Sequence, residues 1–414
     1  MNNLTRRNFL TIAGTAVAGA ALLPRARATE KKKQSFEVSA SLYAWDLHDE
    51  GVERVLDNLQ EMAAVNSVYL LGVMHPEMRP VGGGVFPHNP VRQTWMAEDA
   101  RCYWHPDVKR YGRVKPRLSD HAWLSDTDWL RVLTDAGRKR GLKVGVELSH
   151  AVIDRERMRG EFADMEPRNL QGEVSPQGAI KWLESPCPNH PATLEYLAAV
   201  AADLVANYGI DYLQSCMMTF DPATPDRGGG CFCEHCRKAA PGFGFDLEKI
   251  QAALLVDPRD SRAMTGWNGF RFASVARVYQ KIHAAAHALK PSVDVRYNIP
   301  SPSAPYYGIN LPLMRPYLDS VRVLDYTEQD GNPALMARKY AWFAGVRQDL
   351  SPPLPLLSTV GVRMKATPEL VREGARIAVQ LGAVGLGLGH YDGATFPLLR
   401  AVREGLVEAG VKLG

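Results

Sequence analysis

Residues 191–217, PATLEYLAAVAADLVANYGIDYLQSCM, contain the unit that decides the fold of this chain. The segment starts with a proline, keeps apolar residues at helical spacing and reaches Gly209, which predicts a helix over 191–208. The short apolar run that follows predicts a buried strand over 210–217. A helix that leads directly into a buried strand is typical of proteins built around a parallel sheet.

The same alternation extends over the rest of the chain. Strands are predicted at 36–44, 67–74, 142–149, 210–217, 293–299, 321–326, 354–360 and 384–389. Helices are predicted at 51–65, 126–140, 191–208, 245–289, 311–318, 333–348, 368–381 and 397–409. Strict alternation implies right-handed crossovers between parallel strands, and eight units predict an α/β protein of the (β/α)8 TIM-barrel type. A doubly wound open sheet is the alternative, but no G-x-G-x-x-G follows the first strand.

Extra length is concentrated in three connections, at 75–125, 150–190 and 219–245. These long insertions follow strands 2, 3 and 4, so a barrel would carry them on its C-terminal face, where active sites are built. Loops of this length are uncommon unless they serve a function. We expect one barrel domain over 36–414, with a flexible lead-in at 29–35.

The N-terminal 28 residues have the features of an export signal. The sequence TRRNFL at residues 5–10 precedes a mild apolar run, and the small-x-small sequence ARA occupies 26–28. The paired arginines indicate a twin-arginine signal peptide that is cleaved before Thr29. We therefore expect the Tat translocase as a partner during export, and a periplasmic or secreted mature protein.

The charge of the chain comes from this leader. The whole sequence has 49 basic and 45 acidic residues, and four of the arginines lie within residues 1–28, which contain no acid. A chain that starts at Thr29 is formally neutral, so its charge predicts no nucleic-acid partner. No later stretch approaches the roughly 20 apolar residues of a membrane span, so none is expected in the mature protein.

Two acids within predicted strands are the candidate catalytic residues. Glu147 lies in the apolar run KVGVEL of strand 3, and Asp325 ends the run VRVLD of strand 6. Two carboxylates across a barrel mouth are the minimum equipment of a glycoside hydrolase, because one protonates the leaving oxygen and the other attacks or activates water. This chemistry requires no cofactor.

Polar and aromatic residues near the predicted strand ends could bind a saccharide, with aromatic rings as stacking platforms. The candidate substrate-binding residues are Tyr43, Trp45, His75, Trp104, His105, His150, Gln214, Arg296, Asn298, Tyr326, Glu328, His390 and Asp392.

The cysteines form the sharpest local pattern. Residues 231–236 read CFCEHC, and Cys216 ends strand 4 just before this loop. Cys231, Cys233 and Cys236, with Cys216 or His235, could make a tetrahedral structural zinc site. Export favours disulfides instead, with Cys233–Cys236 or a partner from another loop as the pairs that spacing allows. In both alternatives the cysteines stabilise the long loop and take no part in catalysis.

Three segments together resemble bacterial, Tat-exported (β/α)8-barrel proteins of the glycosyl hydrolase type. They are YWHPD at 103–107 with KPR at 115–117, CPNHP at 187–191 leading into YGIDYL at 208–213, and CFCEHCR at 231–237. The resemblance implies a barrel that acts on carbohydrate, with the C-F-C-x-x-C-R loop after strand 4 as its most specific part. Related barrels often have an acid at the end of strand 4, where this chain has Gln214 and Cys216. The catalytic acids that the resemblance implies would therefore be Glu147 and Asp325 in this chain.

The sequence therefore predicts an exported glycoside hydrolase that acts on an oligo- or polysaccharide. A non-catalytic saccharide-binding barrel is one alternative, favoured by the missing acid in strand 4. A metal-dependent sugar lyase or isomerase that uses His75, Glu147 and His390 is another.

Overall fold

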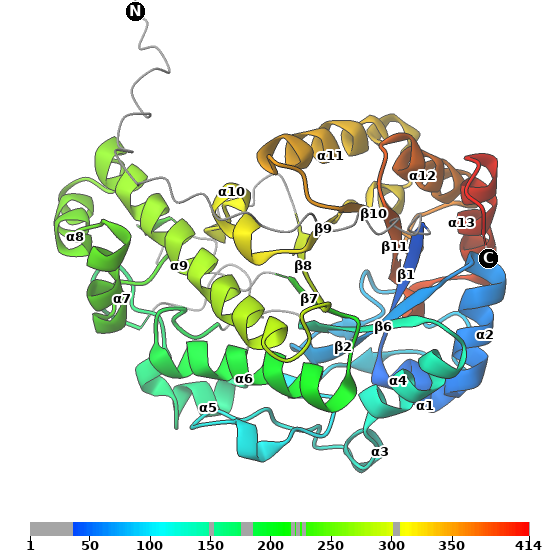
Figure 1. The fold of residues 1–414 in the computed structure, drawn as a ribbon, viewed down its shortest axis with the longest axis horizontal. Helices are drawn as coiled ribbons and strands as arrows, with labels where there is room; N and C mark the ends of the chain where they lie inside the picture. The colour runs from blue at the N-terminus through cyan, green and yellow to red at the C-terminus, as the bar shows by residue number, and fades with distance from the viewer. Residues whose placement is uncertain are drawn as a thin grey trace, which may run out of the picture. The chain divides into compact units, whose positions relative to one another are not determined.

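Eight parallel strands form a closed barrel in the computed structural model (Figure 1), which describes residues 36–148, 153–174, 185–216, 220, 224–225, 229–300 and 307–413. The barrel strands are β1 (Glu37–Leu42), β2 (Ser67–Met74), β6 (Lys143–Leu148), β7 (Tyr212–Cys216), β8 (Asp294–Ile299), β9 (Ser320–Val323), β10 (Leu356–Val360) and β11 (Gly385–His390). The barrel closes because β1 pairs in parallel with both β2 and β11. The prediction of a (β/α)8 barrel is confirmed.

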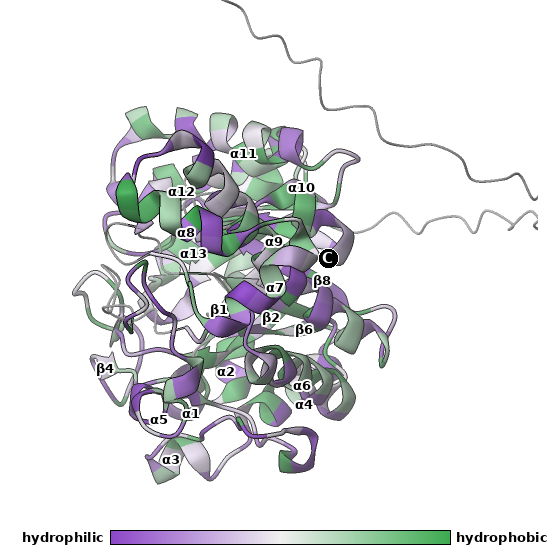
Figure 2. Ribbon diagram, turned by 90° about the vertical axis from the view of Figure 1, so that its left-hand side faces the viewer, coloured by the Kyte–Doolittle hydropathy of each residue, from purple (hydrophilic) through white to green (hydrophobic). Residues whose placement is uncertain are grey.

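A ring of helices covers the outside of the barrel (Figure 1). These helices are α2 (Val52–Ala63), α4 (Trp129–Lys139), α6 (Pro191–Tyr208), α9 (Ser261–His287), α10 (Leu311–Met314), α11 (Ala337–Asp349), α12 (Pro368–Gln380) and α13 (Phe396–Glu408). Helix α2, for example, buries an apolar stripe that contains Val55, Leu56 and Leu59. The outer helices accordingly carry both hydrophobic and hydrophilic residues (Figure 2).

The helix predictions miss two features of the structure. The predicted helix 245–289 is two helices, α8 (Leu247–Val256) and α9, because the Asp260 carboxylate accepts a hydrogen bond from the backbone N–H of Ala263 at 2.7 Å and starts a new helix. Helix α1 (Ala44–Glu50), directly after β1, was not predicted. It starts where the Tyr43 backbone N–H donates to the Asp46 carboxylate at 2.9 Å.

Short elements fill the described parts of the three long connections. They are β3 (Met78–Arg79), β4 (Trp95–Met96), β5 (Arg101–Cys102), α3 (Ala122–Ser125), α5 (Arg155–Arg159) and α7 (Glu234–Ala239). Short 3-10 helices lie at Val108–Arg110, Ala163–Met165, Ala240–Phe243, Arg315–Tyr317, Thr327–Asp330, Pro333–Leu335 and Tyr391–Gly393. Strand β5 pairs antiparallel with β2, which ties the first long connection to the barrel wall. Among the described residues, none of the helices has the length and apolar character needed to cross a bilayer.

The lower interior of the barrel, near the N-terminal ends of the strands, holds a buried ion-pair network. Nη1 of Arg296 lies 2.8 Å from a Glu37 oxygen, and Nη2 lies 2.7 Å from Asp294. Lys143 adds a second cation 3.2 Å from Glu37. Although burial alone would raise it, these cations lower the pKa of Glu37 to about 2. Arg296 was expected to bind substrate, but its partners are the first residues of β1 and β8, so its side chain lies in this lower layer and not at the mouth.

Candidate functional site

Glu147 is the buried carboxylate around which the upper interior of the barrel is organised. Its Oε2 atom accepts hydrogen bonds from Gln214 Nε2 at 2.5 Å and from Asn298 Nδ2 at 2.9 Å. Nη2 of Arg322 lies 3.4 Å from the same oxygen. These residues come from β6, β7, β8 and β9, which are neighbours in the barrel. All three donors converge on one oxygen, and among the described residues Oε1 accepts no hydrogen bond.

The groups around Glu147 retain unused hydrogen-bonding capacity. The amide oxygens of Gln214 and Asn298 are buried and have no partner within the described residues. Buried polar atoms normally have partners, so unpaired acceptors beside a carboxylate fit a site that a polar ligand completes. Arg322 is fixed from its other side, because its Nη1 donates to the Tyr69 hydroxyl at 2.6 Å.

A second polar group lies where β1 and β11 end. His390 Nδ1 is 2.7 Å from the Tyr43 hydroxyl and 3.0 Å from Ser41 Oγ. Burial, with the nearby Arg79 and other arginines, holds the pKa of His390 well below its usual value, so its imidazole is neutral. Arg79 also lies over the Tyr43 ring, 4.4 Å from its centroid.

Arg79 links this second group to two acids. It forms a buried fork with Asp392, with Nε and Nη2 at 2.8 and 2.9 Å from the two carboxylate oxygens. Its Nη1 lies 3.5 Å from Glu77, whose side chain is 29% exposed. Burial raises the pKa of Glu77 against the pull of the neighbouring arginines. Burial also lowers the pKa of the nearby His75 to about 4.

Asp325 has a set of partners that is separate from that of Glu147. Its carboxylate accepts a hydrogen bond from the Thr327 backbone N–H at 3.0 Å and lies 3.7 Å from Nζ of Lys339. Lys339 belongs to α11, outside the barrel, so Asp325 faces that helix. Tyr326, the next residue, takes the other direction, and its Cε1 would be 3.7 Å from a Cβ atom placed on Gly389 of β11.

Burial and contacts correct two further expectations for the mouth, Glu328 and Trp104. Glu328 is fully buried, with Nζ of Lys339 at 2.9 Å and the Gly361 N–H at 2.9 Å from its carboxylate. Trp104 is also fully buried, and its indole N–H donates to Asp203 of α6 at 3.2 Å, so it packs between the barrel wall and that helix. His105 is exposed, with 2.9 Å between its Nε2 atom and the Ser125 carbonyl oxygen, and its role in binding stays a prediction.

The two aromatic residues predicted after strand 1 stack on each other. The rings of Tyr43 and Trp45 are 4.5 Å apart and nearly parallel, and both side chains are buried. His150, the remaining candidate, lies outside the described residues.

Four cysteines meet in one buried cluster. The sulfur atoms of Cys187, Cys231, Cys233 and Cys236 all lie within 4.8 Å of one another, a group that could hold a metal ion. Cys216 was expected in this set, but it lies at the end of β7, paired in register with Asn298 of the barrel. Cys187, just before α6, takes its place. All six cysteines of the chain are free thiols in this structure.

The sequence reasoning missed Arg322, Arg79, Glu77 and the role of Cys187. Arg322 was detectable, because a cation inside the apolar run VRV is unusual and needs a buried partner. Nothing in the local sequence of Arg79 indicates that it would pair with Asp392, which lies 313 residues away.

Comparison with solved structures gives the same fold in several glycoside hydrolases. The glycoside hydrolase domain of PgaB (BpsB) from Bordetella bronchiseptica has a TM-score of 0.59 at 15% identity, over 92% of this chain and 99% of that one. A β-galactosidase from Bacillus circulans sp. alkalophilus gives 0.58 at 15%, over 91% and 56%. The catalytic domain of a β-amylase from Paenibacillus polymyxa gives 0.51 at 14%, over 92% and 99%.

At these identities the likeness establishes the fold. The chain is a (β/α)8 barrel whose solved structural neighbours include glycoside hydrolases. It matches no family model, and no curated protein is significantly similar in sequence.

Proposed function

We propose that this protein is a glycoside hydrolase that uses Glu147 as a catalytic carboxylate. The observation that carries the proposal is the asymmetry of the Glu147 hydrogen bonds. Three donors hold Oε2, while Oε1 accepts none from the described residues. A carboxylate fixed by one oxygen keeps the other for a reacting atom, which is the preorganisation that acid–base or nucleophilic catalysis needs.

A glycosidase needs a second carboxylate, and sequence reasoning pairs Glu147 with Asp325. The ties of Asp325 to Thr327 and Lys339 favour a binding role for it instead. We assign the proton donor to Glu77, which follows β2 beside Arg79 and remains partly exposed. Its raised pKa keeps the carboxyl protonated to a higher pH, as a general acid requires.

In this mechanism Glu77 protonates the glycosidic oxygen as the bond to the sugar breaks. In the same step Glu147 either attacks the anomeric carbon or takes a proton from the water that attacks it. In the first case a glycosyl–enzyme ester forms, and water, deprotonated by Glu77, then cleaves it and releases the sugar and Glu147. Arg322 holds Glu147 in position. The neutral His390 and the amide groups of Gln214 and Asn298 are suited to bind sugar hydroxyls.

The test is a screen of aryl glycosides and oligosaccharides for release of reducing sugar. The unmodified protein should hydrolyse at least one of them, and Glu147→Gln should lower kcat at least about 100-fold. Glu156→Gln, which changes an exposed carboxylate, is the matched control. Full turnover in Glu147→Gln would refute the assignment. Saccharide binding without turnover in the unmodified protein would favour the non-catalytic barrel, to which Gln214 in strand 4 points.

A metal-dependent lyase or isomerase would need converging ligands at the mouth. Among the described residues, two groups of three or more side chains could hold a metal ion. One is the cysteine cluster, and the other is His283, His287 and Asp319. Neither contains His75, Glu147 or His390, so the geometry favours the hydrolase.

As its cofactor we propose one structural zinc ion in the cysteine cluster. Cys187 Sγ lies 3.5 Å from Cys233 Sγ and 3.4 Å from Cys236 Sγ. A disulfide requires about 2.05 Å, whereas the sulfurs of a tetrahedral zinc–thiolate site are about 3.8 Å apart. The Arg168 backbone N–H and Asn189 Nδ2 each lie 3.4 Å from a cluster sulfur, as donors that support thiolates.

Such a zinc ion would join the loop after β6 to the loop after β7. Cys187 comes from the former, and the other three cysteines come from the latter. Both loops belong to the C-terminal face, so the ion would brace the rim of the site without taking part in the chemistry.

We also propose that the protein is exported by the Tat translocase and acts in the periplasm or outside the cell. The motif TRRNFL and the sequence ARA at 26–28 support this proposal. Tat transport carries folded proteins, so zinc could be bound before export.

A further inference from the structure

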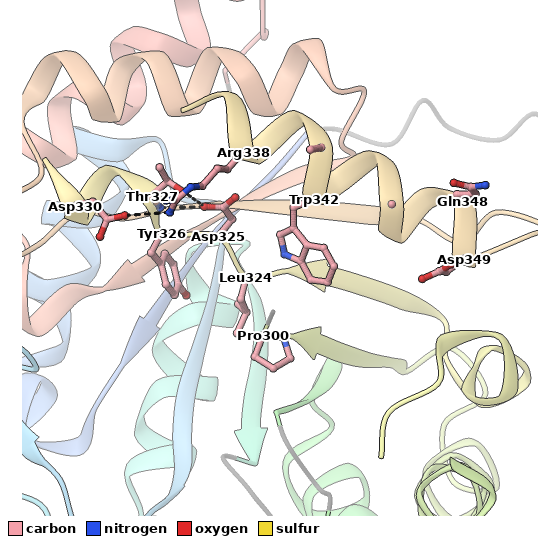
Figure 3. Close-up of a pocket in the computed structure, with 12 residues that line it drawn as sticks. Pro300, Leu324, Asp325, Tyr326, Thr327, Asp330, Arg338, Trp342, Gln348 and Asp349 are labelled. Atoms are coloured by element: carbon pink, nitrogen blue, oxygen red, sulfur yellow. Dashed lines mark hydrogen bonds and ion pairs between the residues drawn. The ribbon is translucent and has the colours of Figure 1, made fainter. Parts of the chain in front are cut away.

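A cavity of about 740 Å³ lies between the ends of β8 and β9 and the inner side of α11 (Figure 3). It is separate from the hydrogen bonds that hold Glu147, and the mechanism above does not use it. Its lining includes Pro300, Leu324, Asp325, Tyr326, Arg338 and Trp342. The volume is enough for one or two sugar rings.

One wall of the cavity is an aromatic and apolar surface. Trp342 projects from α11 toward Leu324 and Pro300 (Figure 3). Its indole nitrogen is buried and has no hydrogen-bond partner among the described residues. Tryptophan gives a large flat face together with one donor, which is the combination that a sugar ring with its axial C–H groups and hydroxyls can use.

The other wall is polar. The Asp325 carboxylate is held by the Thr327 backbone and by Lys339, so its position is fixed. Asp330 and Arg338 face each other at 3.8 Å, and their side chains are 54% and 63% exposed. Separating an ion pair that is this exposed to solvent costs little free energy, so both groups are available to a ligand.

The lining also restricts the charge of the ligand. Among the described residues, three aspartates and one arginine line the cavity. A uronic acid or a sulfated sugar would meet net repulsion there, whereas an uncharged or amino sugar would not.

Tyr326 connects this cavity with the barrel mouth. It lines the cavity, and its ring also lies against Gly389 at the end of β11. A chain of sugar rings could therefore extend past Tyr326 from one site to the other.

We propose that the cavity is a saccharide subsite that holds an uncharged or amino sugar ring remote from the bond cleaved at Glu147, with Trp342 as its stacking platform and Asp325 as its fixed acceptor. This proposal rests on the function proposed above. It gives Asp325 a binding role in place of the catalytic one predicted from sequence.

The experiment measures binding by calorimetry for cello-, galacto- and chito-oligosaccharides of two to six units. For the series that binds, affinity of the unmodified protein should increase with length. Trp342→Ala should reduce this gain in affinity with length by about tenfold or more, and Trp342→Phe should retain most of the gain. The control is Tyr340→Ala on the same helix, where the hydroxyl contacts Gln380 and lies outside the cavity. Thermal unfolding of each variant checks that it folds.

The outcomes separate the two proposals. Length-dependent binding that requires Trp342, without any hydrolysis, supports the subsite and overturns the hydrolase. Hydrolysis with the same length dependence in Trp342→Ala overturns the subsite alone. If none of the oligosaccharides binds, the subsite is refuted.

Discussion

Arg322 and Glu147 face each other across the interior of the barrel, with 3.4 Å between Nη2 and Oε2. Both side chains are almost completely buried, and β7 and β8 separate their strands in the sheet order. A buried charge pair is costly to form and more costly to break, because removing one partner leaves the other charge uncompensated. The pair therefore ties the stability of the barrel to the geometry of its proposed site.

The first prediction concerns this pair. Arg322→Met should lower the free energy of unfolding by about 3–5 kcal/mol, because the Glu147 charge loses its buried partner. In a Glu147→Gln background, Arg322→Met should lower the free energy of unfolding by clearly less. Urea unfolding of both single variants and the double variant measures the difference. Equal costs in the two backgrounds would mean that the ion pair does not stabilise the fold.

The second prediction is a pH profile. As a general acid, Glu77 must be protonated, so activity should fall as pH rises through its pKa, which burial places above the ordinary value. Glu77→Gln should lower kcat/KM and abolish this alkaline decline. The fall in kcat/KM should be much smaller for an aryl glycoside with a very acidic leaving group, because such a group needs little protonation. A profile that is unchanged in Glu77→Gln would assign the proton donor elsewhere.

The third prediction separates binding from catalysis at Asp325. If its carboxylate binds a remote sugar ring, Asp325→Asn should raise KM for oligosaccharides several-fold, while turnover stays within about threefold of the unmodified protein. Steady-state kinetics on a long and a short substrate separate the two effects. If Asp325→Asn instead slows turnover by about 100-fold or more, as expected for Glu147→Gln, Asp325 would be assigned as the second catalytic carboxylate, as the sequence predicts.

The fourth prediction concerns the cysteine cluster. Elemental analysis of the purified protein should give one zinc ion per chain, and thiol titration after denaturation with a chelator should give six thiols. Cys187→Ser should lose the metal and a few kcal/mol of stability, whereas the control Cys216→Ser should keep the metal. Four thiols and no zinc would establish a disulfide instead.

The fifth prediction concerns the leader. Mass spectrometry of protein recovered from the periplasm or medium should show Thr29 as the first residue. Replacement of Arg6 and Arg7 by lysine should block export and leave the precursor inside the cell, since the twin-arginine pair is the recognised element. Unchanged export of the lysine variant would point to another route.

Much of the fold was predictable because the signals are local. Helix α6 begins and ends at the predicted residues, since a proline at its first turn and Gly209 after it mark both ends. The division between α8 and α9 was missed because both halves keep a helical pattern, and a cap at Asp260 interrupts it.

The candidate site was predictable only in part. Glu147, Gln214 and Asn298 were identified as polar residues in apolar strands, and the structure brings them together. Asp325 was assigned to the mouth from its position at a strand end. A strand end does not specify direction, and at this point the chain turns so that Asp325 faces α11 and Tyr326 faces the barrel.

The sequence by itself determined the alternation of strands and helices, because hydrophobic periods of two and 3.6 residues depend only on neighbours along the chain. Which polar groups meet was decided by the tertiary structure. Strands β6 to β9 lie side by side around the interior of the barrel, so Arg322 of β9 reaches Glu147 of β6 across 175 positions of sequence. The loops bring Cys187 to the other cysteines in the same way. Packing and electrostatics in three dimensions decide which residues meet across such separations. A local sequence pattern therefore does not predict these pairs.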